Sequence, residues 1–327
     1  MKVLVTGSNG FIGSHLAEVL ARRGDDVVCL VRKTSRTDSL AGAKVGFAVG
    51  DVRDLESLRP AVRGMDRIFH LAGVINASSW AAYHEANTVG TQNLIGACLE
   101  ENPGLEKFVF VSSISALGPS PPGKALDETA ECRPVSDYGR SKRLAEQAVL
   151  EAAGRLPVTI LRPANILGPR QSELFESIKL LSRGIKPLVG RVESRTSVAA
   201  VEDLVRAIVL AADDPRSRGQ IYLVTDGCSY SWRELTDAVA FALGPRRRYL
   251  KIPFPVQYAV AAGSELGARL KRTTPRLTRS NVTAPRKFDW VYDGSKIGRE
   301  LGFVPEHDMA DAVRRTVEWY RTRGMIK

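Results

Sequence analysis

Cysteine and histidine are scarce in this sequence of 327 residues, and neither is clustered. The four cysteines stand far apart without a Cys-x-x-Cys pair, which argues against a disulfide framework or a zinc site. The four histidines are equally scattered, so we expect no metal centre. The sequence has no apolar run near the roughly 18 to 20 residues that span a bilayer, and no basic and apolar leader opens it. We therefore expect a cytoplasmic protein.

Acidic residues are scarce in one late stretch. Between residues 241 and 290, eleven Lys and Arg residues stand against two acidic ones, a local net charge of +9 in a chain whose total is +11. Such a run can be a solvated face, a site for an anionic substrate, or a contact with an anionic membrane. An apolar stretch, 256–270, separates its basic clusters, so peripheral membrane contact through residues 246–287 is a hypothesis. Nucleic acid is not expected, because no recognised reading motif accompanies the charge.

Apolar, β-branched runs alternate with amphipathic helical spacing through the first half of the chain. The runs cover residues 2–6, 26–31, 45–49, 67–71, 107–111 and 157–161. Continuous apolar runs of this length are typical of buried parallel strands. The pattern predicts an α/β fold, a doubly wound parallel sheet of the Rossmann type.

The first of these runs leads into a turn with three glycines. Residues 3–16 read VLVTGSNGFIGSHL, in which a strand would end at Thr6 and a helix would start near Phe11. The start of that helix would offer free backbone N–H groups and a positive dipole end to an anion. Gly7 would permit the tight turn, Gly10 would let a pyrophosphate approach the backbone, and Gly13 would let the helix pack closely on the sheet. The position after a first strand favours a dinucleotide site over a plain structural turn.

The second run lacks the acidic residue that NAD-binding units usually place after this strand for the ribose 2′-hydroxyl. The chain continues instead as Val31-Arg32-Lys33-Thr34-Ser35. A carboxylate would repel a 2′-phosphate, whereas an arginine can hold it with two hydrogen bonds. Arg32 therefore favours NADP(H). The alternative is that Arg32 is a solvated loop residue and the protein uses NAD(H).

Six motifs follow one another in a fixed order. They are TGxxGxxG at 6–13, Asp51-Val52-Arg53-Asp54, His70-Leu71-Ala72-Gly73, Asn87-Thr88-Val89-Gly90-Thr91, Ser112-Ser113 and Tyr138-Gly139-Arg140-Ser141-Lys142. With this ordered set the chain resembles the extended short-chain dehydrogenase/reductase family over essentially its whole length. The resemblance implies a seven-stranded Rossmann domain that binds a nicotinamide dinucleotide. It implies that Asp51 and Val52 lie near the adenine and that Leu71, Ala72 and Gly73 lie along the cofactor. With the residues argued above, the expected cofactor site comprises Gly7, Gly10, Phe11, Ile12, Gly13, Arg32, Asp51, Val52, Leu71, Ala72, Gly73, Tyr138, Lys142 and Pro163.

The alternation weakens after Pro163, which sets the expected organisation of the chain. We predict an NADP(H)-binding domain at 1–163 and a smaller C-terminal α/β part at 164–327. The smaller part would bind the substrate and interleave with the sheet, without being independent. Its helical spacing recurs at 201–212, 231–243 and 308–321. Homodimers are common in the family, so a homodimer is a hypothesis by analogy.

Tyr138 and Lys142 are one helical turn apart, so their side chains would share a face. Bringing a tyrosine from a pKa of about 10 to about 7 takes roughly 4 kcal/mol of phenolate stabilisation. Lys142 and the positive nicotinamide of an oxidised cofactor can supply it together. Ser113, favoured over its neighbour Ser112, would hydrogen-bond the substrate oxygen as charge develops. The resemblance implies that Asn87 supports this active site.

The substrate is a small molecule whose class stays open. Ile114-Ser115 replace the Asp-Glu pair of sugar 4,6-dehydratases, and Ile114 replaces the cysteine of certain epimerase-reductases, so both activities are disfavoured. Asn165 resembles the asparagine that holds a substrate diphosphate in sugar-nucleotide enzymes, although Thr196 stands where those enzymes commonly carry an arginine. The segment 290–320 resembles the ending of the 3β-hydroxysteroid dehydrogenase and dihydroflavonol-reductase branch. There the stretch 256–270 could cover an apolar substrate.

We therefore predict an NAD(P)(H)-dependent oxidoreductase that interconverts a secondary alcohol and a ketone at a Ser-Tyr-Lys site. Its catalytic residues would be Ser113, Tyr138, Lys142 and Asn87, and Ser113 and Asn165 would contact an apolar or mixed substrate. The first alternative is a sugar-nucleotide epimerase or reductase. A remote alternative, a non-catalytic NADP(H) sensor, would be expected to lack the Tyr-Lys pair.

Overall fold

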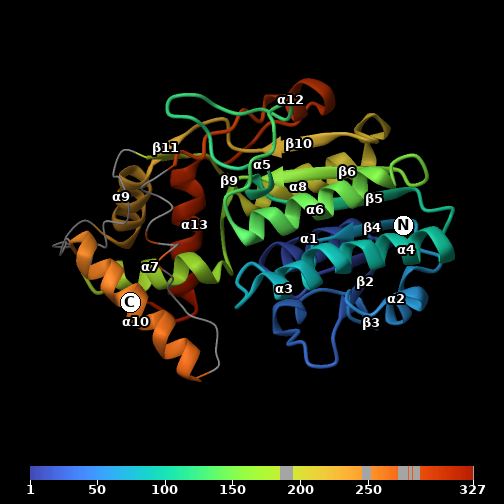
Figure 1. The fold of residues 1–327 in the computed structure, drawn as a ribbon, viewed down its shortest axis with the longest axis horizontal. Coiled ribbons are helices and arrows are strands. Elements are labelled where there is room, and N and C mark those ends of the chain that lie inside the picture. The colour runs from blue at the N-terminus through green and yellow to red at the C-terminus, as the bar shows by residue number, and fades with distance from the viewer. Residues whose placement is uncertain (185–193, 245–251, 272–278, 280–281, 283–287, 327) are drawn as a thin grey trace.

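The computed structural model describes residues 1–184, 194–244, 252–271, 279, 282 and 288–326 (Figure 1). Its centre is a seven-stranded sheet in the order β10-β6-β5-β4-β1-β2-β3, with parallel neighbours throughout. The strands are β1 (Lys2–Thr6), β2 (Asp26–Val31), β3 (Gly46–Val49), β4 (Arg67–His70), β5 (Lys107–Val111), β6 (Val158–Pro163) and β10 (Ile221–Val224). The predicted Rossmann-type fold is confirmed.

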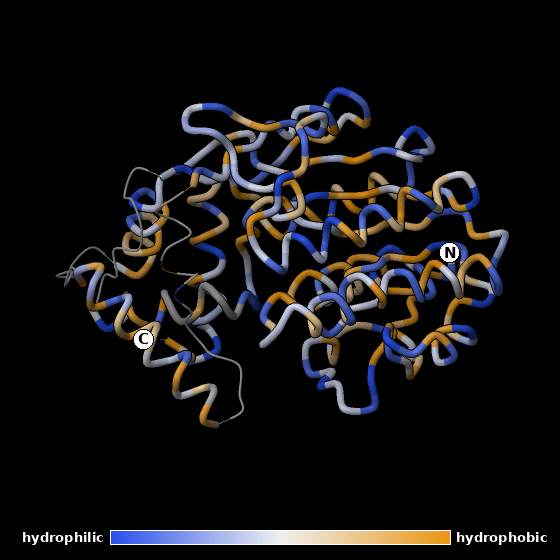
Figure 2. The backbone as a smooth tube through the Cα atoms, viewed as in Figure 1, coloured by the Kyte–Doolittle hydropathy of each residue, from blue (hydrophilic) through white to orange (hydrophobic). Residues whose placement is uncertain are grey.

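Helices cover both faces of this sheet. One face packs against α1 (Phe11–Arg23), α8 (Val201–Asp213) and α12 (Ser295–Leu301), and the other against α2 (Leu55–Val62), α4 (Gly90–Glu101) and α6 (Asp137–Glu151). Every residue of β5 and β6 is buried, and Figure 2 shows the hydrophobic colour concentrated along the central strands. Because such strands are covered on both faces, they read in the sequence as continuous apolar runs and not as alternating ones.

The seventh strand comes from beyond the predicted boundary at Pro163. β10 pairs in parallel with β6, with Ile221 beside Ile160. The later helices α8, α9 (Trp232–Leu243) and α13 (Met309–Thr322) match the expected helical spacing closely. Together with α7 (Ser172–Ser182), α9 and α13 enclose a second apolar cluster to one side of the sheet (Figure 1).

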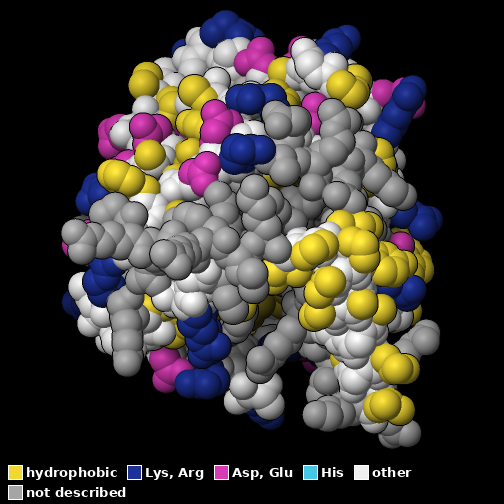
Figure 3. Space-filling model, turned by 90° about the vertical axis from the view of Figure 1, so that its left-hand side faces the viewer, with side chains coloured by type: hydrophobic (Ala, Val, Ile, Leu, Met, Phe, Trp, Pro, Cys, Tyr) yellow, Lys and Arg dark blue, Asp and Glu magenta, His cyan; other side chains and the backbone are white. Residues whose placement is uncertain are grey.

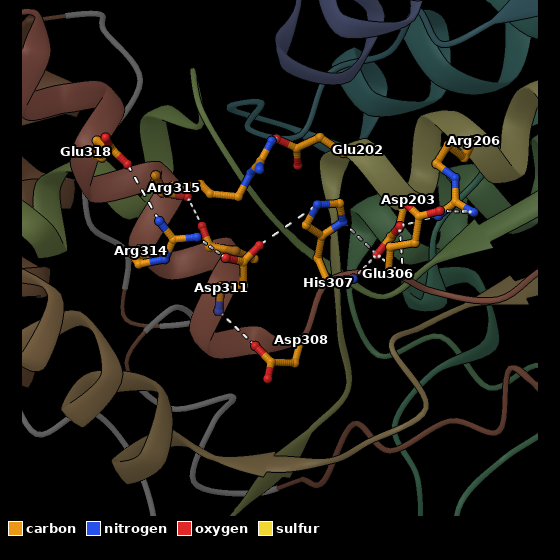
Figure 4. A network of polar contacts seen from close by, with 12 residues as sticks. Glu202, Asp203, Arg206, Glu306, His307, Asp308, Asp311, Arg314, Arg315 and Glu318 are labelled. Atoms are coloured by element: carbon orange, nitrogen blue, oxygen red, sulfur yellow. Dashed lines mark hydrogen bonds and ion pairs between the residues drawn. The ribbon is translucent and has the colours of Figure 1, made fainter.

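A polar network attaches the C-terminal segment to the start of α8 (Figure 4). The buried carboxylate of Asp203 accepts backbone N–H groups of Glu306 at 3.1 Å and His307 at 2.9 Å. It also forms an ion pair with Arg206 at 2.8 Å. Since these donors engage both carboxylate oxygens, Asp203 serves as a structural tie between α8 and the segment before α13.

Candidate active site

The turn after β1 is closed by contacts that only glycine allows. Gly7 has a φ of +69°, and a Cβ there would lie 2.7 Å from the backbone nitrogen of Ala72. A Cβ on Gly13 would overlap the carbonyl oxygen of Gly7. Gly13 is therefore needed for the contact between α1 and the turn itself, which is a more local reason than the predicted packing of the helix on the sheet.

Gly10 is the N-cap of α1 in an extended conformation, and no side chain caps this helix end. The first amides of α1, which include those of Phe11 and Ile12, are therefore left for another acceptor. A hollow lies beside this helix end. Its lining brings together residues that the sequence assigned to the cofactor: Gly7, Arg32, Asp51, Val52, Ala72 and Gly73.

Two further predicted cofactor residues stand at strand ends of the same sheet. Leu71 directly follows β4, and its backbone N–H donates to the carbonyl oxygen of Thr6 at the end of β1, at 3.2 Å. Pro163 is the buried last residue of β6. The carboxyl ends of parallel strands meet at one edge of a sheet, which is where open α/β folds bind their ligands.

Two arginines border the hollow and differ in their partners. Arg53 forms an ion pair with Asp51 at 2.7 Å, and its hydrogen bonds hold the pKa of that carboxyl below its usual range. Arg32 is exposed, and its backbone N–H donates to the hydroxyl of Ser35 at 3.1 Å. Within the described part of the chain the Arg32 guanidinium forms no ion pair. It is therefore the arginine that can take an incoming anion.

Two serines follow β5, and they differ in their exposure to solvent. Ser112 is buried, and its hydroxyl has no hydrogen-bond partner among the described residues. Ser113 is half-buried and is the N-cap of α5 (Ile114–Leu117), where its hydroxyl oxygen accepts the N–H of Ser115 at 3.1 Å. This arrangement leaves the proton of Ser113 free to be donated to a substrate oxygen. The greater exposure of Ser113 thus favours it over Ser112 as the hydroxyl that contacts the substrate.

A glycine inside the Tyr-x-x-x-Lys motif sets the spacing between the two short segments that carry Ser113 and Tyr138. Tyr138 lies in the first turn of α6, whose N-cap Ser136 accepts the N–H of Gly139. A Cβ on Gly139 would overlap the carbonyl oxygen of Ser115. Gly139 therefore lets α6 approach the start of α5. Gly139 was not among the predicted site residues, and its place inside the motif was the only signal for it.

Lys142 is buried one turn further along α6. Its ammonium donates to the carbonyl oxygen of Val111 at 2.8 Å and stands 4.2 Å from the ring centre of Phe110. Burial lowers its pKa to about 7, while the negative charge of Glu146 acts in the opposite direction. Glu146 is itself in a buried two-bond ion pair with Arg162, at 2.8 Å for each bond. The charge on Lys142 is therefore poorly compensated in this fold, and a nearby phenolate would stabilise it.

Asn87 ties the loop after β4 to α6. Its side-chain oxygen accepts the N–H of Val74 at 2.7 Å, and its amide donates to the Val74 carbonyl at 3.0 Å and to the hydroxyl of Ser141 at 2.9 Å. Ser141 in turn donates to the carbonyl oxygen of Tyr138 at 2.8 Å. Asn87 is buried, so these bonds give it a positioning role next to the Tyr-Lys pair.

His70 shows a similar structural use of a motif residue. It is fully buried between the hydroxyls of Thr6, at 2.7 Å, and Thr91, at 2.9 Å. Burial and the charge of Lys142 lower its pKa to about 3. His70 is therefore neutral at physiological pH and joins the ends of β1 and β4 to α4.

Asn165 begins β7 (Asn165–Leu167), which pairs with β9 (Val198–Ala200). The exposed Asn165 donates its amide to the buried hydroxyl of Thr196 at 2.5 Å. The guanidinium of Arg195 points elsewhere, because it donates to the hydroxyl of Ser229 at 3.0 Å and lies 3.8 Å from Glu234. Arg195 is thus engaged on the side of α9 and is not paired with Asn165.

Comparison with known proteins places this site in a family. Residues 3–225 match the sequence model of the NAD dependent epimerase/dehydratase family. The chain belongs to this family. It is an NAD(P)-dependent enzyme of the extended short-chain dehydrogenase/reductase type, as its motifs predict.

Individual relatives differ in their named substrates. Sterol demethylase protein B of Methylococcus capsulatus is 32% identical over 100% of both chains. The 2-alkyl-3-oxoalkanoate reductase of Stenotrophomonas maltophilia is 31% identical over 96% of this chain and 98% of that one. The solved structure of MoeE5 in complex with UDP-glucose and NAD is 25% identical, with a TM-score of 0.80 and 99% of each chain covered. The fold and the enzyme class are therefore shared, and the substrate has to be argued from the site.

Proposed function

We propose that the protein interconverts a secondary alcohol and a ketone on a largely apolar substrate, with NADP(H) as its preferred cofactor. The observation that carries the substrate class is the surface beside Tyr138. The ring of Tyr83 lies 6.3 Å from that of Tyr138, and its hydroxyl donates to the Ile75 carbonyl at 2.9 Å. The side chain of Ile75 is 57% exposed. The guanidinium of Arg140 lies over the nearby Trp80 ring, with its central carbon 4.8 Å from the ring centre. This aromatic and aliphatic surface suits an apolar ligand.

The residues of the glycine turn fit a dinucleotide. The uncapped start of α1 and the close backbone approach that Gly7 and Gly10 allow would hold its pyrophosphate. Asp51 and Val52 would lie along the adenosine half, and Arg32 with Ser35 would take a 2′-phosphate through charge-assisted hydrogen bonds. When bound, the nicotinamide supplies the hydride donor or acceptor.

The remaining chemistry falls to Tyr138 and Lys142 of α6, to Ser113 at the N-cap of α5, and to Asn87. In the oxidative direction the substrate hydroxyl gives its proton to the phenolate oxygen of Tyr138 as the carbon loses its hydride. The Ser113 hydroxyl donates to the substrate oxygen and holds it in place. The ammonium of Lys142 stabilises the phenolate, and Asn87 fixes the loop against α6. In the reductive direction Tyr138 returns the proton to the oxygen.

A sugar-nucleotide epimerase or reductase is the second candidate. Asn165 supports it, because its exposed amide stands where an asparagine holds a diphosphate in such enzymes, and the relative MoeE5 binds UDP-glucose. Arg195 weighs against it, because its guanidinium is engaged with Ser229 and Glu234. The unpaired Arg32 also weighs against an epimerase. An epimerase returns its hydride within one turnover and usually keeps NAD bound, whereas Arg32 favours NADP(H) and therefore net redox chemistry.

A thermal-shift panel would separate the two candidates. Protein saturated with NADPH is mixed with UDP-, dTDP- and GDP-sugars and, separately, with hydroxysteroids, flavonoids and long-chain β-keto or β-hydroxy compounds. A ligand at about a hundred times its dissociation constant adds roughly 2.7 kcal/mol of stability. Stabilisation by the apolar compounds alone supports the proposal, and stabilisation by sugar nucleotides alone replaces it with the second candidate.

The role of Tyr138 is tested by Tyr138→Phe. This variant should lose turnover of the substrate found in the panel and keep wild-type affinity for NADPH, because only the transferable proton is removed. Tyr230→Phe removes a phenolic hydroxyl that donates to Asp226 at 2.7 Å, outside the site, and is the matched control that should keep turnover. Wild-type turnover in Tyr138→Phe would mean that another group moves the proton.

A further inference from the structure

Helix α10 (Phe254–Lys271) carries apolar residues on its outer side. Gln257, Ala261 and Ala268 are buried and mark its inner side. The opposite side exposes large hydrophobic side chains: Val256 at 51%, Val260 at 58%, Leu266 at 61% and Leu270 at 80% exposure. At 100° per residue these four fall within a stripe about 120° wide. We name Val256, Val260, Leu266 and Leu270 the outer stripe. Figure 3 shows hydrophobic side chains gathered on this face of the molecule.

The outer stripe is free of charge. The helix has one acidic residue, Glu265, which helical periodicity places on the side away from the stripe. Its carboxylate forms an ion pair with Arg279 at 2.8 Å and accepts the backbone N–H of Arg279 at 2.7 Å. The one negative charge of α10 is thus already compensated. An outer helix face in water normally carries polar residues, so this stripe is suited to an apolar environment.

The charges around α10 in the sequence have one sign. Residues 246–287 contain eleven Lys and Arg residues and a single acidic residue, the paired Glu265. Most of the eleven fall outside the described residues, and they contribute only their positive charge to the proposal. Arg269 and Lys271 belong to the last turn of α10. Basic residues at the end of an amphipathic helix are attracted to anionic lipid headgroups while its apolar side chains enter the headgroup boundary.

We propose that α10 lies in the surface of an anionic membrane, with the outer stripe inserted among the lipids. The helix would lie on the membrane and not cross it, because no helix of the described chain is long and apolar enough to span a bilayer. Self-association through α10 is disfavoured, since a contact between two copies would bring two strongly basic segments together. The proposal rests on α10 and does not depend on the identity of the substrate.

Sedimentation with lipid vesicles tests the proposal. The full chain should sediment with vesicles of phosphatidylcholine mixed with phosphatidylserine, bind weakly to phosphatidylcholine alone, and detach as salt screens the charges. Val260→Glu and Leu266→Glu together should lower partitioning by about tenfold or more, because two side chains no longer insert. Val304→Glu replaces a side chain that is 66% exposed elsewhere and is the matched control. It should bind as the wild type does.

A second readout does not rely on the double variant being folded. Val260→Cys in a Cys228→Ser background, labelled with an environment-sensitive dye, should change its emission on addition of phosphatidylserine vesicles. Val304→Cys in the same background should not. The proposal is overturned if the protein does not bind anionic vesicles, or if the dyes at positions 260 and 304 change their emission alike. It is also overturned if the protein dimerises with concentration and this dimerisation disappears in the Val260→Glu variant. The last outcome would assign the stripe to a second copy.

Discussion

Replacing Arg32 by alanine tests the cofactor preference most directly. Arg32 is exposed at the end of β2, borders the hollow beside α1 and has no ion-pair partner in the described chain. Hydrogen bonds to a charged group contribute about 1.5–3 kcal/mol, so the loss of Arg32 should weaken NADPH binding by about 10- to 150-fold. The exposed position favours the lower part of this range, because water screens the charges. Binding of NADH should change little, since it has no 2′-phosphate.

The assay is the ratio of kcat/KM for NADPH to kcat/KM for NADH, with fluorescence titration of both cofactors as an independent measure. Arg36→Ala is the matched control, because Arg36 lies in the same loop but is already paired with Asp38 at 3.0 Å. It should leave the ratio near the wild-type value. If Arg32→Ala leaves the ratio unchanged, Arg32 is a solvated loop residue and the proposed NADP(H) preference is refuted.

Two further perturbations follow from contacts described above. Gly13→Ala should lower the melting temperature and abolish cofactor binding, because its Cβ would overlap the Gly7 carbonyl; Gly96→Ala in α4, where the nearest atom is Leu55 Cδ1 at 3.9 Å, should be neutral or stabilising. Since burial lowers the pKa of Lys142 from 10.5 to about 7, the unfolded chain binds more protons between these values and stability rises with pH across that window. Lys142→Met should therefore raise the melting temperature of the cofactor-free protein at about pH 6, with a gain that shrinks towards pH 10. A constant gain across the range would contradict the assigned pKa.

The sequence was most informative where the fold is determined locally. The strand runs are apolar because their strands are covered on both faces, so β1 and β2 were predicted with their observed bounds. Gly7 was predicted from the demands of a tight turn, and its φ of +69° agrees. Ser113 was preferred over Ser112 in the sequence, and the greater exposure of Ser113 in the structure gives this preference a physical basis.

The sequence was least informative where a residue's role depends on partners far along the chain. Nothing in the spacing of Asn87 indicates that its amide would meet Ser141, 54 residues later. The need for glycine at 139 depends on the carbonyl of Ser115, which only the packing of α5 on α6 brings close. β10 was not predicted, because it lies beyond Pro163, where the alternation of apolar runs and helical spacing weakens in the sequence. Such contacts are made by tertiary packing, which periodicity does not record.

The contrast between the glycine turn and the loop after β2 has an evolutionary consequence. At Gly7 and Gly13 the backbone leaves no room for any side chain, so these positions are closed to substitution while the fold is retained. Arg32 stands outside the apolar core, where a change disturbs no packing. If Arg32 sets the cofactor preference as proposed, a few mutations at this exposed position would exchange one dinucleotide for the other, and the cofactor could change in evolution without a change of fold.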